Sequence, residues 1–155
     1  MAQISIAEDV VKLIIDLLEA NPGLIVVDSI AETVARAEVE EGAEKTTMAL
    51  KARLLSKDLN IINEKKQNTT ILFINQLRAN LSLYGPKFYT TSGNSLPFYC
   101  SMRLEVKKIE NIYKDNRKTG EIIGQIIACK TTKNKTFIPQ KTASFKYFYE
   151  DCRVL

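Results

Sequence analysis

Thr69–Arg78, TTILFINQLR, is a short apolar run that ends in side-chain amides followed by an arginine. A second run of the same kind, Leu24–Ser29, LIVVDS, ends in a carboxylate and a hydroxyl. Apolar runs of this length, rich in branched residues and bounded by turn signals, are typical of strands covered on both faces. The two runs therefore predict neighbouring strands of a parallel sheet inside an α/β layer structure.

The polar residues at the ends of these two runs form the first candidate site. In open parallel sheets, ligands bind in the crevice beyond the carboxyl ends of the strands. Asp28 and Ser29 would lie there after the first strand, and Asn75 and Gln76 after the second. This arrangement predicts a nucleotide site. The plainer interpretation is an aspartate and a glutamine that cap strand ends.

The remaining patterns place helices beside these strands and a meander after them. Residues 6–20 and 47–62 have apolar positions at helical spacing. Residues 78–97 form a polar stretch far longer than the ~4–6 residues of an ordinary loop, which indicates a functional or disordered segment. From residue 98 the pattern turns to strands, and Cys100, Met102, Leu104 and Val106 are expected on a buried face. The predicted organisation is one domain: an α/β half over 1–77, a loop over 78–97 and an antiparallel β-meander over 98–155.

Composition limits the chemistry. The chain has 155 residues, no histidine and three cysteines without CxxC spacing, so histidine triads, histidine metal sites and a disulfide framework are not expected. Its apolar stretches are shorter than the ~20 residues that span a bilayer, and a cytoplasmic protein without membrane contact is expected. Residues 103–155 hold twelve Lys/Arg and six Asp/Glu, whereas the preceding part is slightly acidic. A basic C-terminal half favours polyanions, although solvated lysines on exposed strands give the same pattern.

Four motifs resemble those of the bacterial RecA recombinases and occur in that family's order. They are LIVVDSIAETVARAEVEEG at Leu24–Gly42, ILFINQLR at Ile71–Arg78, TTSGNSLPFYCSMRLEV at Thr90–Val106 and TKNK at Thr132–Lys135. The resemblance covers residues 22–149 and implies a fragment of a RecA-like P-loop NTPase core, from its Walker B strand onward. The phosphate-binding string GxxxxGK[ST] is absent from these 155 residues.

The resemblance implies ATP and Mg²⁺ as cofactors and gives roles to the residues beyond the strands. Asp28 resembles the Walker B aspartate that holds Mg²⁺ through its water shell. Gln76 resembles a sensor of the γ-phosphate that couples to the loop after it, and Lys133 and Lys135 resemble lysines that reach a neighbouring subunit's γ-phosphate. The further residues implied on the nucleotide side are Ser29, Asn75, Phe98, Pro139 and Tyr149. Without the resemblance, the two lysines are simply the end of a basic hairpin.

Two segments resemble the family's DNA-binding loops. The first includes the start of the second helix and carries over Met48, Arg53 and Ser56, but Asn60 stands where a further basic residue is expected. The second follows the 71–75 strand, and its Ser92 replaces a glycine of the family. The residues that this second segment implies for DNA are Arg78, Leu81, Thr91, Ser92, Gly93 and Asn94. A disordered polar loop is the alternative that periodicity favours.

The function implied by the resemblance is homologous recombination and DNA repair, including the SOS response to DNA damage. A protein of this kind binds single-stranded DNA with ATP, pairs it with double-stranded DNA, and forms filaments with neighbouring RecA-type subunits. Without a phosphate-binding loop, the isolated chain is expected to be inactive as an ATPase. The alternatives are a catalytically silent half-recombinase that binds DNA or modulates a partner filament, and a different ATPase or helicase loader of the same fold.

Overall fold

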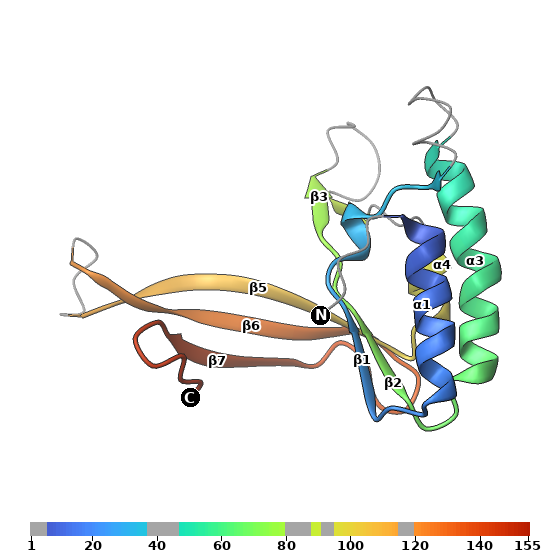
Figure 1. The fold of residues 1–155 in the computed structure, drawn as a ribbon. Helices are drawn as coiled ribbons and strands as arrows, with labels where there is room; N and C mark the ends of the chain where they lie inside the picture. The colour runs from blue at the N-terminus through green and yellow to red at the C-terminus, as the bar shows by residue number, and fades with distance from the viewer. Residues whose placement is uncertain (1–5, 37–46, 80–87, 91–94, 115–119) are drawn as a thin grey trace. The chain divides into compact units, whose positions relative to one another are not determined.

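The computed structural model describes residues 6–36, 47–79, 88–90, 95–114 and 120–155. Side chains are described for 6–36, 56–77, 96–114 and 120–155. The chain divides into two compact units, Met1–Tyr99 and Cys100–Leu155. Figure 1 shows helices beside a small sheet in the first unit, and long strands in the second.

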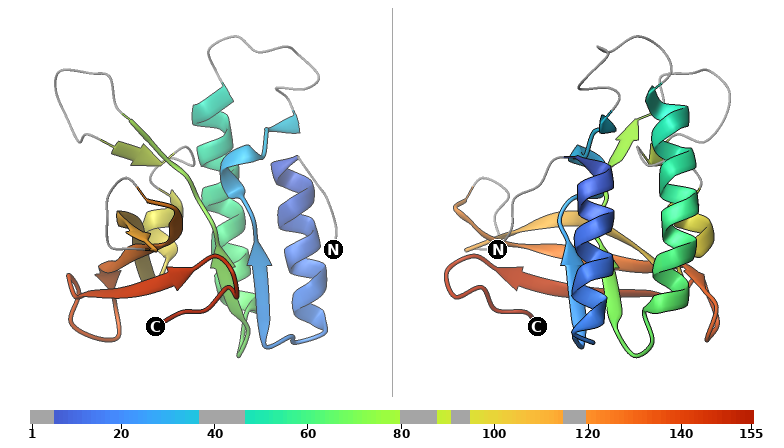
Figure 2. Two further views of the ribbon diagram at one scale, coloured as in Figure 1. Left: turned by 90° about the vertical axis from the view of Figure 1, so that its left-hand side faces the viewer. Right: turned by 45° about the vertical axis from the view of Figure 1, so that its right-hand side comes forward.

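The first unit contains the predicted parallel pair. Strands β1 (Leu24–Val27) and β2 (Thr70–Phe73) are hydrogen-bonded in parallel, with Leu24 opposite Thr70 and Val27 opposite Phe73. Helices α1 (Ala7–Glu19) and α3 (Thr47–Lys65) lie side by side on the same face of this sheet (Figures 1 and 2). The mixed α/β architecture and both expected helices are confirmed.

The core of the first unit forms where the helices cover the sheet. On α1 the buried residues recur every three or four positions, so one stripe of the helix faces inward. The apolar residues buried in this unit are Ala7, Val11, Ile14, Leu18, Ile25, Ile30, Ala35, Leu59, Ile62 and Leu96. Because they come from both helices and from β1, burial of these side chains holds the three elements together.

The opposite face of the β1–β2 sheet is exposed in the described part of the chain. Leu24, Val26 and Leu72 are 57%, 50% and 47% exposed, whereas Ile25 between the first two is 8% exposed. The expectation that both faces would be covered is therefore wrong for the described residues. An apolar run indicates that a strand can be covered on two sides, but it does not say whether the covering elements belong to the same 155 residues.

The segment after β1 returns to the start of α1. The 3-10 helix η1 (Ile30–Glu32) follows β1, and the Ala7 amide then donates to the Val34 carbonyl at 2.8 Å. The Arg36 amide donates to both carboxylate oxygens of Glu8 at 3.1 Å, and the Arg36 guanidinium pairs with Asp9 at 2.5 Å. These bonds fix the path of the chain as it leaves the end of β1.

The segment predicted as a long loop contains regular structure at both ends. Strand β3 (Leu77–Ala79) pairs antiparallel with β4 (Phe88–Thr90), and the short helix α4 (Ser95–Tyr99) follows. The prediction of a structureless 78–97 segment is wrong for these parts. Strands of three residues are too short to show an alternating pattern in the sequence. The residues that pair between β3 and β4 are also nine or more positions apart in the chain.

The second unit is an antiparallel sheet in the order β5-β6-β7. Strand β6 (Ile122–Asn134) pairs with β5 (Met102–Tyr113) on one side and with β7 (Thr142–Phe148) on the other (Figure 1). The β-meander is confirmed. The chain end pairs with β7 as well, since the Lys146 amide donates to the Leu155 carbonyl at 2.7 Å and the Leu155 amide donates back at 2.9 Å.

The apolar positions of β5 are exposed in the described part of the chain. Met102, Leu104 and Val106 are 48%, 52% and 64% exposed, so the predicted burial of this face is wrong here. The period-2 pattern identified the strand correctly. It identified a face suited to burial, but none of the described elements covers that face.

No helix in the described part of the chain is long and apolar enough to cross a membrane.

Gly124 lies where β6 and β7 approach closely. A Cβ at this position would overlap the Tyr147 carbonyl oxygen and come within 3.2 Å of the Phe148 Cα, both backbone atoms. We expect Gly124→Ala to reduce the free energy of unfolding by about 1–3 kcal/mol, because backbone cannot move aside as a flexible side chain can. Chemical denaturation followed by circular dichroism measures this. Gly23→Ala is the control, since its Cβ has nothing within 4 Å, and an equal effect of both substitutions would contradict the packing argument.

Asp58 on α3 gives a pH-dependent prediction. Burial raises the pKa of its carboxyl above the ordinary value of 3.8, Lys57 opposes this, and the charge of Glu8 adds to it. A raised folded-state pKa means that the folded chain binds the proton more tightly, so stability falls as pH rises from 3.8 through the folded pKa. Asp58→Asn should therefore stabilise the protein at pH 7 and change little near pH 3, where both states are protonated. Thermal melts against pH test this, with exposed Asp16→Asn as control, and an equal gain in both variants would count against it.

Candidate functional site

The carboxyl ends of β1 and β2 lie at one edge of the first unit, as the two apolar runs predicted. Beyond the last paired residues, the Ile74 amide donates to the Val27 carbonyl at 2.9 Å. The chain after β1 then turns back, and the Ile30 amide donates to the Ile74 carbonyl at 3.0 Å. These two bonds bring the Asp28–Ser29 and Asn75–Gln76 pairs to the same edge.

The side chains at this edge differ in exposure. Asp28 and Gln76 are exposed, whereas Ser29 and Asn75 are half-buried. The Ser29 Oγ is buried and has no hydrogen-bond partner among the described residues. The peptide bond between Asp28 and Ser29 is cis. A buried hydroxyl left without a partner is costly, so this edge offers an unused polar group beside an exposed carboxylate.

Asp28 can hold a metal ion only together with other ligands. Within the described ranges, no cluster of three or more His, Cys, Asp or Glu side chains is placed to bind a metal. Magnesium suits this situation, because it keeps several waters and is held by one or two carboxylates plus the phosphates of a substrate. The residues at the edge therefore fit Mg²⁺ that arrives with a nucleotide, and they do not fit a permanent structural metal.

Lys133 and Lys135 lie at the end of β6 in the second unit. Lys133 is opposite Arg103 on β5, and the Lys135 amide donates to the Ser101 carbonyl at 2.9 Å. The Lys133 side chain is half-buried and that of Lys135 is exposed. Pro139 lies in the exposed β6–β7 connection that follows. The structure thus brings these three predicted residues to one end of the second unit's sheet.

Two predicted aromatic contacts have packing partners within their own units. Phe98 on α4 is 72% exposed and meets Tyr99 edge-on, with ring centroids 5.5 Å apart. Tyr149, after β7, meets Tyr147 edge-on at 5.8 Å, and its amide donates to the Ile123 carbonyl at 3.0 Å. A hydrogen bond with Cys152 raises the pKa of the Tyr147 phenol. The ring contact with Tyr147 and the hydrogen bond to Ile123 therefore help to position Tyr149 within its own unit.

The residues predicted to contact DNA fall mostly outside the described part. Met48 and Arg53 lie on α3 and Arg78 lies on β3, but their side chains are outside the described residues. Ser56, on α3, is half-buried. The predicted residues that lie wholly outside the described ranges are Leu81, Thr91, Ser92, Gly93 and Asn94.

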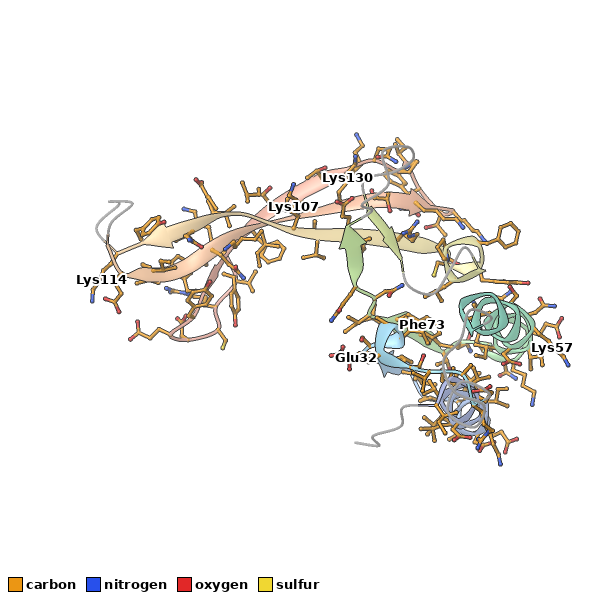
Figure 3. The ribbon with its side chains drawn as sticks, turned by 90° about the horizontal axis from the view of Figure 1, so that it is seen from above. Glu32, Lys57, Phe73, Lys107, Lys114 and Lys130 are labelled. Atoms are coloured by element: carbon orange, nitrogen blue, oxygen red, sulfur yellow. The ribbon has the colours of Figure 1, made fainter. Side chains whose placement is uncertain are left out.

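A pair of lysines on the second unit was not singled out by sequence reasoning. Glu105 is opposite Lys130 and Lys107 is opposite Ala128, so Lys107 and Lys130 are diagonal neighbours on one face of the sheet. Both side chains are exposed, and Figure 3 shows them projecting from the same part of the β5–β6 ribbon. The lysine pair could have been found from the sequence only with the register of the two strands, because its members are far apart in the chain.

Comparison with known proteins identifies the family. The family model for the RecA N-terminal domain matches residues 3–153. Protein RecA of Mycoplasma mycoides is 44% identical over 129 residues, which cover 81% of this chain and 36% of that protein. Protein RecA of Fusobacterium nucleatum is 41% identical over 129 residues, covering 81% of this chain and 33% of the relative. Protein RecA of Leptospira meyeri is 35% identical over 153 residues, covering 96% of this chain and 38% of the relative.

The chain spans roughly a third to two fifths of the length of these relatives. The match to the family model extends over nearly all of its residues and covers both structural units. The chain therefore belongs to the RecA family.

Proposed function

We propose that this chain forms the nucleotide-responsive and DNA-binding part of a RecA-type recombination and repair protein. In this proposal it acts in the cytoplasm, with ATP and Mg²⁺, on single-stranded and double-stranded DNA and beside neighbouring RecA-type subunits. The observation that carries the proposal is the in-register parallel pairing of β1 and β2, which brings Asp28 and Gln76 to one edge.

The nucleotide chemistry follows from the residues at that edge. Asp28 orients the water shell of Mg²⁺, and the buried Ser29 hydroxyl offers a further polar group. When bound, Mg²⁺ neutralises charge that develops on the phosphates during transfer. Gln76 directly precedes β3, so a hydrogen bond from its amide to a terminal phosphate would link nucleotide state to the position of that strand.

Lys133 and Lys135 complete the proposal from the second unit. Placed beside the terminal phosphate of a neighbouring subunit's nucleotide, their ammonium groups would stabilise charge in trans, as an arginine finger does. Asn75 is proposed to contact the nucleotide at the β1–β2 edge, and Phe98, Pro139 and Tyr149 are proposed as further nucleotide-side contacts. Backbone donors for the β- and γ-phosphates would come from residues outside this chain, because its 155 residues contain no GxxxxGK[ST] string.

DNA binding is proposed at two places. Met48, Arg53, Ser56 and the Arg78–Asn94 segment would contact single-stranded DNA, chiefly through phosphates. The lysine pair, Lys107 and Lys130, adds a second cationic surface on the β5–β6 ribbon, which suits a further polyanionic strand.

A catalytically silent module is the second candidate. The absence of a phosphate-binding string from these 155 residues favours it, because that string forms the cradle of backbone amides in phosphate-loop proteins. In this case the chain would bind DNA or modulate a partner filament without hydrolysing ATP.

A chimera tests the nucleotide proposal. Residues 22–149 would replace the matching segment of the Mycoplasma mycoides relative, which is 44% identical. We expect single-stranded DNA to stimulate ATP hydrolysis by the chimera, and Asp28→Asn to reduce turnover by about 10–100-fold, because the carboxylate orients the metal's water ligands. Glu64→Gln, at an exposed carboxylate on α3 within the transplanted segment, is the control. Unchanged turnover in Asp28→Asn would contradict the metal role, and a folded, DNA-binding chimera without hydrolysis would support the silent module.

A salt series tests the DNA surfaces on the chain itself. Fluorescence anisotropy of labelled oligo-dT should give weak binding with a negative slope of log K against log salt, about −0.7 for each phosphate contacted on a single strand. The double variant Lys107→Ala/Lys130→Ala should bind more weakly, with a slope shallower by about 1.4. Lys12→Ala/Lys65→Ala removes the same charge from the first unit and serves as control. Equal losses in the two double variants would show a general charge effect and refute a site at the lysine pair.

A further inference from the structure

Strand β5 is an outer strand of the second unit's sheet. The strand order is β5-β6-β7, so β6 pairs with one edge of β5 and no described strand pairs with the other edge (Figure 1). The β7 side of the sheet differs, because the chain end pairs there through bonds between Lys146 and Leu155. An unpaired edge presents a row of backbone donors and acceptors to which a further strand can add.

Hydrogen bonds to β6 show which backbone groups of β5 point outward. The Ser101 carbonyl accepts from the Lys135 amide at 2.9 Å, and the Arg103 carbonyl accepts from the Thr132 hydroxyl at 3.4 Å. Both carbonyls therefore point toward β6. Because backbone groups alternate in direction along a strand, those of the even-numbered residues in this part of β5 point to the outer edge. These residues are Met102, Leu104 and Val106.

Residues 102–106 have none of the usual features that prevent pairing at a strand edge. Natural edge strands are commonly protected by proline, by lysine or by a bulge. In β5 the lysines come later, at Lys107 and Lys108, and a register shift follows between Lys108 and Glu110. The outer edge available for pairing is therefore the stretch before these residues.

The sequence of this stretch, Met-Arg-Leu-Glu-Val, complements a second copy of itself. In an antiparallel pair centred on Leu104, the two Leu104 side chains are opposite each other and Met102 is opposite Val106. On the other face of the sheet, Arg103 is opposite Glu105. Each apolar side chain thus meets an apolar one and each charge meets its opposite, which are the cross-strand pairs that stabilise an antiparallel ladder.

Charges within the sheet favour the same pairing. Arg103 is opposite Lys133 on β6, so two cations are neighbours there, which is unfavourable. Glu105 is opposite Lys130 on β6. In the antiparallel pair, Glu105 of the second copy lies beside Arg103 and offsets the repulsion from Lys133. A second copy of this chain therefore fits the edge in backbone direction, apolar pattern and charge.

We propose that two copies of this chain pair through the outer edges of β5, antiparallel and about a twofold axis at Leu104. The pairing joins two three-stranded sheets into one continuous sheet. Because the axis repeats every contact, the Arg103–Glu105 and Met102–Val106 pairs each occur twice. The contact is short, so the dimer is weak and its population depends on concentration. In the proposed function no residue of this edge contacts another subunit, so the interface goes beyond it.

Sedimentation equilibrium over a concentration series measures the association. We expect a monomer–dimer equilibrium in which Leu104→Lys raises the dissociation constant by at least about tenfold, because two ammonium groups then meet at the axis. Ile138→Lys adds the same charge at another exposed apolar position and should change the constant by less than about twofold. A chain that stays monomeric up to about 1 mM, or a dimer that Leu104→Lys leaves intact, would overturn the proposal.

An exchange of charges tests the register. Arg103→Glu alone and Glu105→Arg alone each place like charges opposite each other, so each should raise the dissociation constant by about tenfold. The double variant Arg103→Glu/Glu105→Arg restores opposite charges and should return the constant to within about twofold of the wild-type value. Failure of the double variant to restore association would contradict pairing centred on Leu104.

Amide hydrogen exchange on the unmodified chain locates the contact. The amides of Leu104 and Val106 should exchange rapidly in dilute solution and become protected as the concentration rises. The amides of Glu105 and Lys107 point toward β6 and should be protected throughout. Outer amides already protected in the monomer would show that another part of this chain covers the edge, and outer amides unprotected in the dimer would place the contact elsewhere. Either result would refute the proposal without bearing on the β1–β2 edge, whose residues are unchanged.

Discussion

Two hydrogen bonds join the segments that follow β1 and β2, and they determine the geometry of the candidate nucleotide site at this edge of the sheet. The Ile74 amide extends the parallel ladder by one step beyond Phe73, and the Ile74 carbonyl then accepts from Ile30. A slip of one residue in one of the two strands would turn that strand's side chains to the opposite face of the sheet. The in-register pairing therefore decides that Asp28 and Gln76 emerge together. Ile25 on β1 and Ile30 just after it are buried, and burial of these side chains favours that register.

The two units carry different chemistry. The first brings to one sheet edge a carboxylate, amides and a buried hydroxyl that has no partner among the described residues, which suits a metal-bound polyphosphate. The second is a three-stranded antiparallel sheet with lysines on its strands and at the end of β6. Cationic side chains on a sheet can bind phosphates without reading base sequence, which fits the DNA binding proposed for this chain.

The sequence predicted the helices, the strands and the shared edge of β1 and β2 well, because each depends on a pattern within a short segment of the chain. The apolar runs at 24–27 and 70–73, the amphipathic α1 and the meander all depend on spacing within one segment. Two failures came from partners that local patterns do not reveal. Leu24 and Met102 were assigned to buried faces that the described chain leaves open, and β3 was missed because its partner, β4, lies beyond an intervening segment. Lys107 and Lys130 were missed for the same reason, since only the strand register makes them neighbours.

The most direct test of the shared edge is paramagnetic broadening of amide signals by manganese with ATP. Mn²⁺ occupies the oxygen ligands that Mg²⁺ uses, and its unpaired electrons broaden nearby resonances even when binding is weak. With the isotope-labelled chain, the account predicts that the signals of residues 28–30 and 74–76 broaden together at low manganese, while those of α1 at Asp16 stay sharp. Broadening at Asp28 without Asn75 and Gln76, or broadening at neither strand end, would contradict the claim that the two strands form one nucleotide edge.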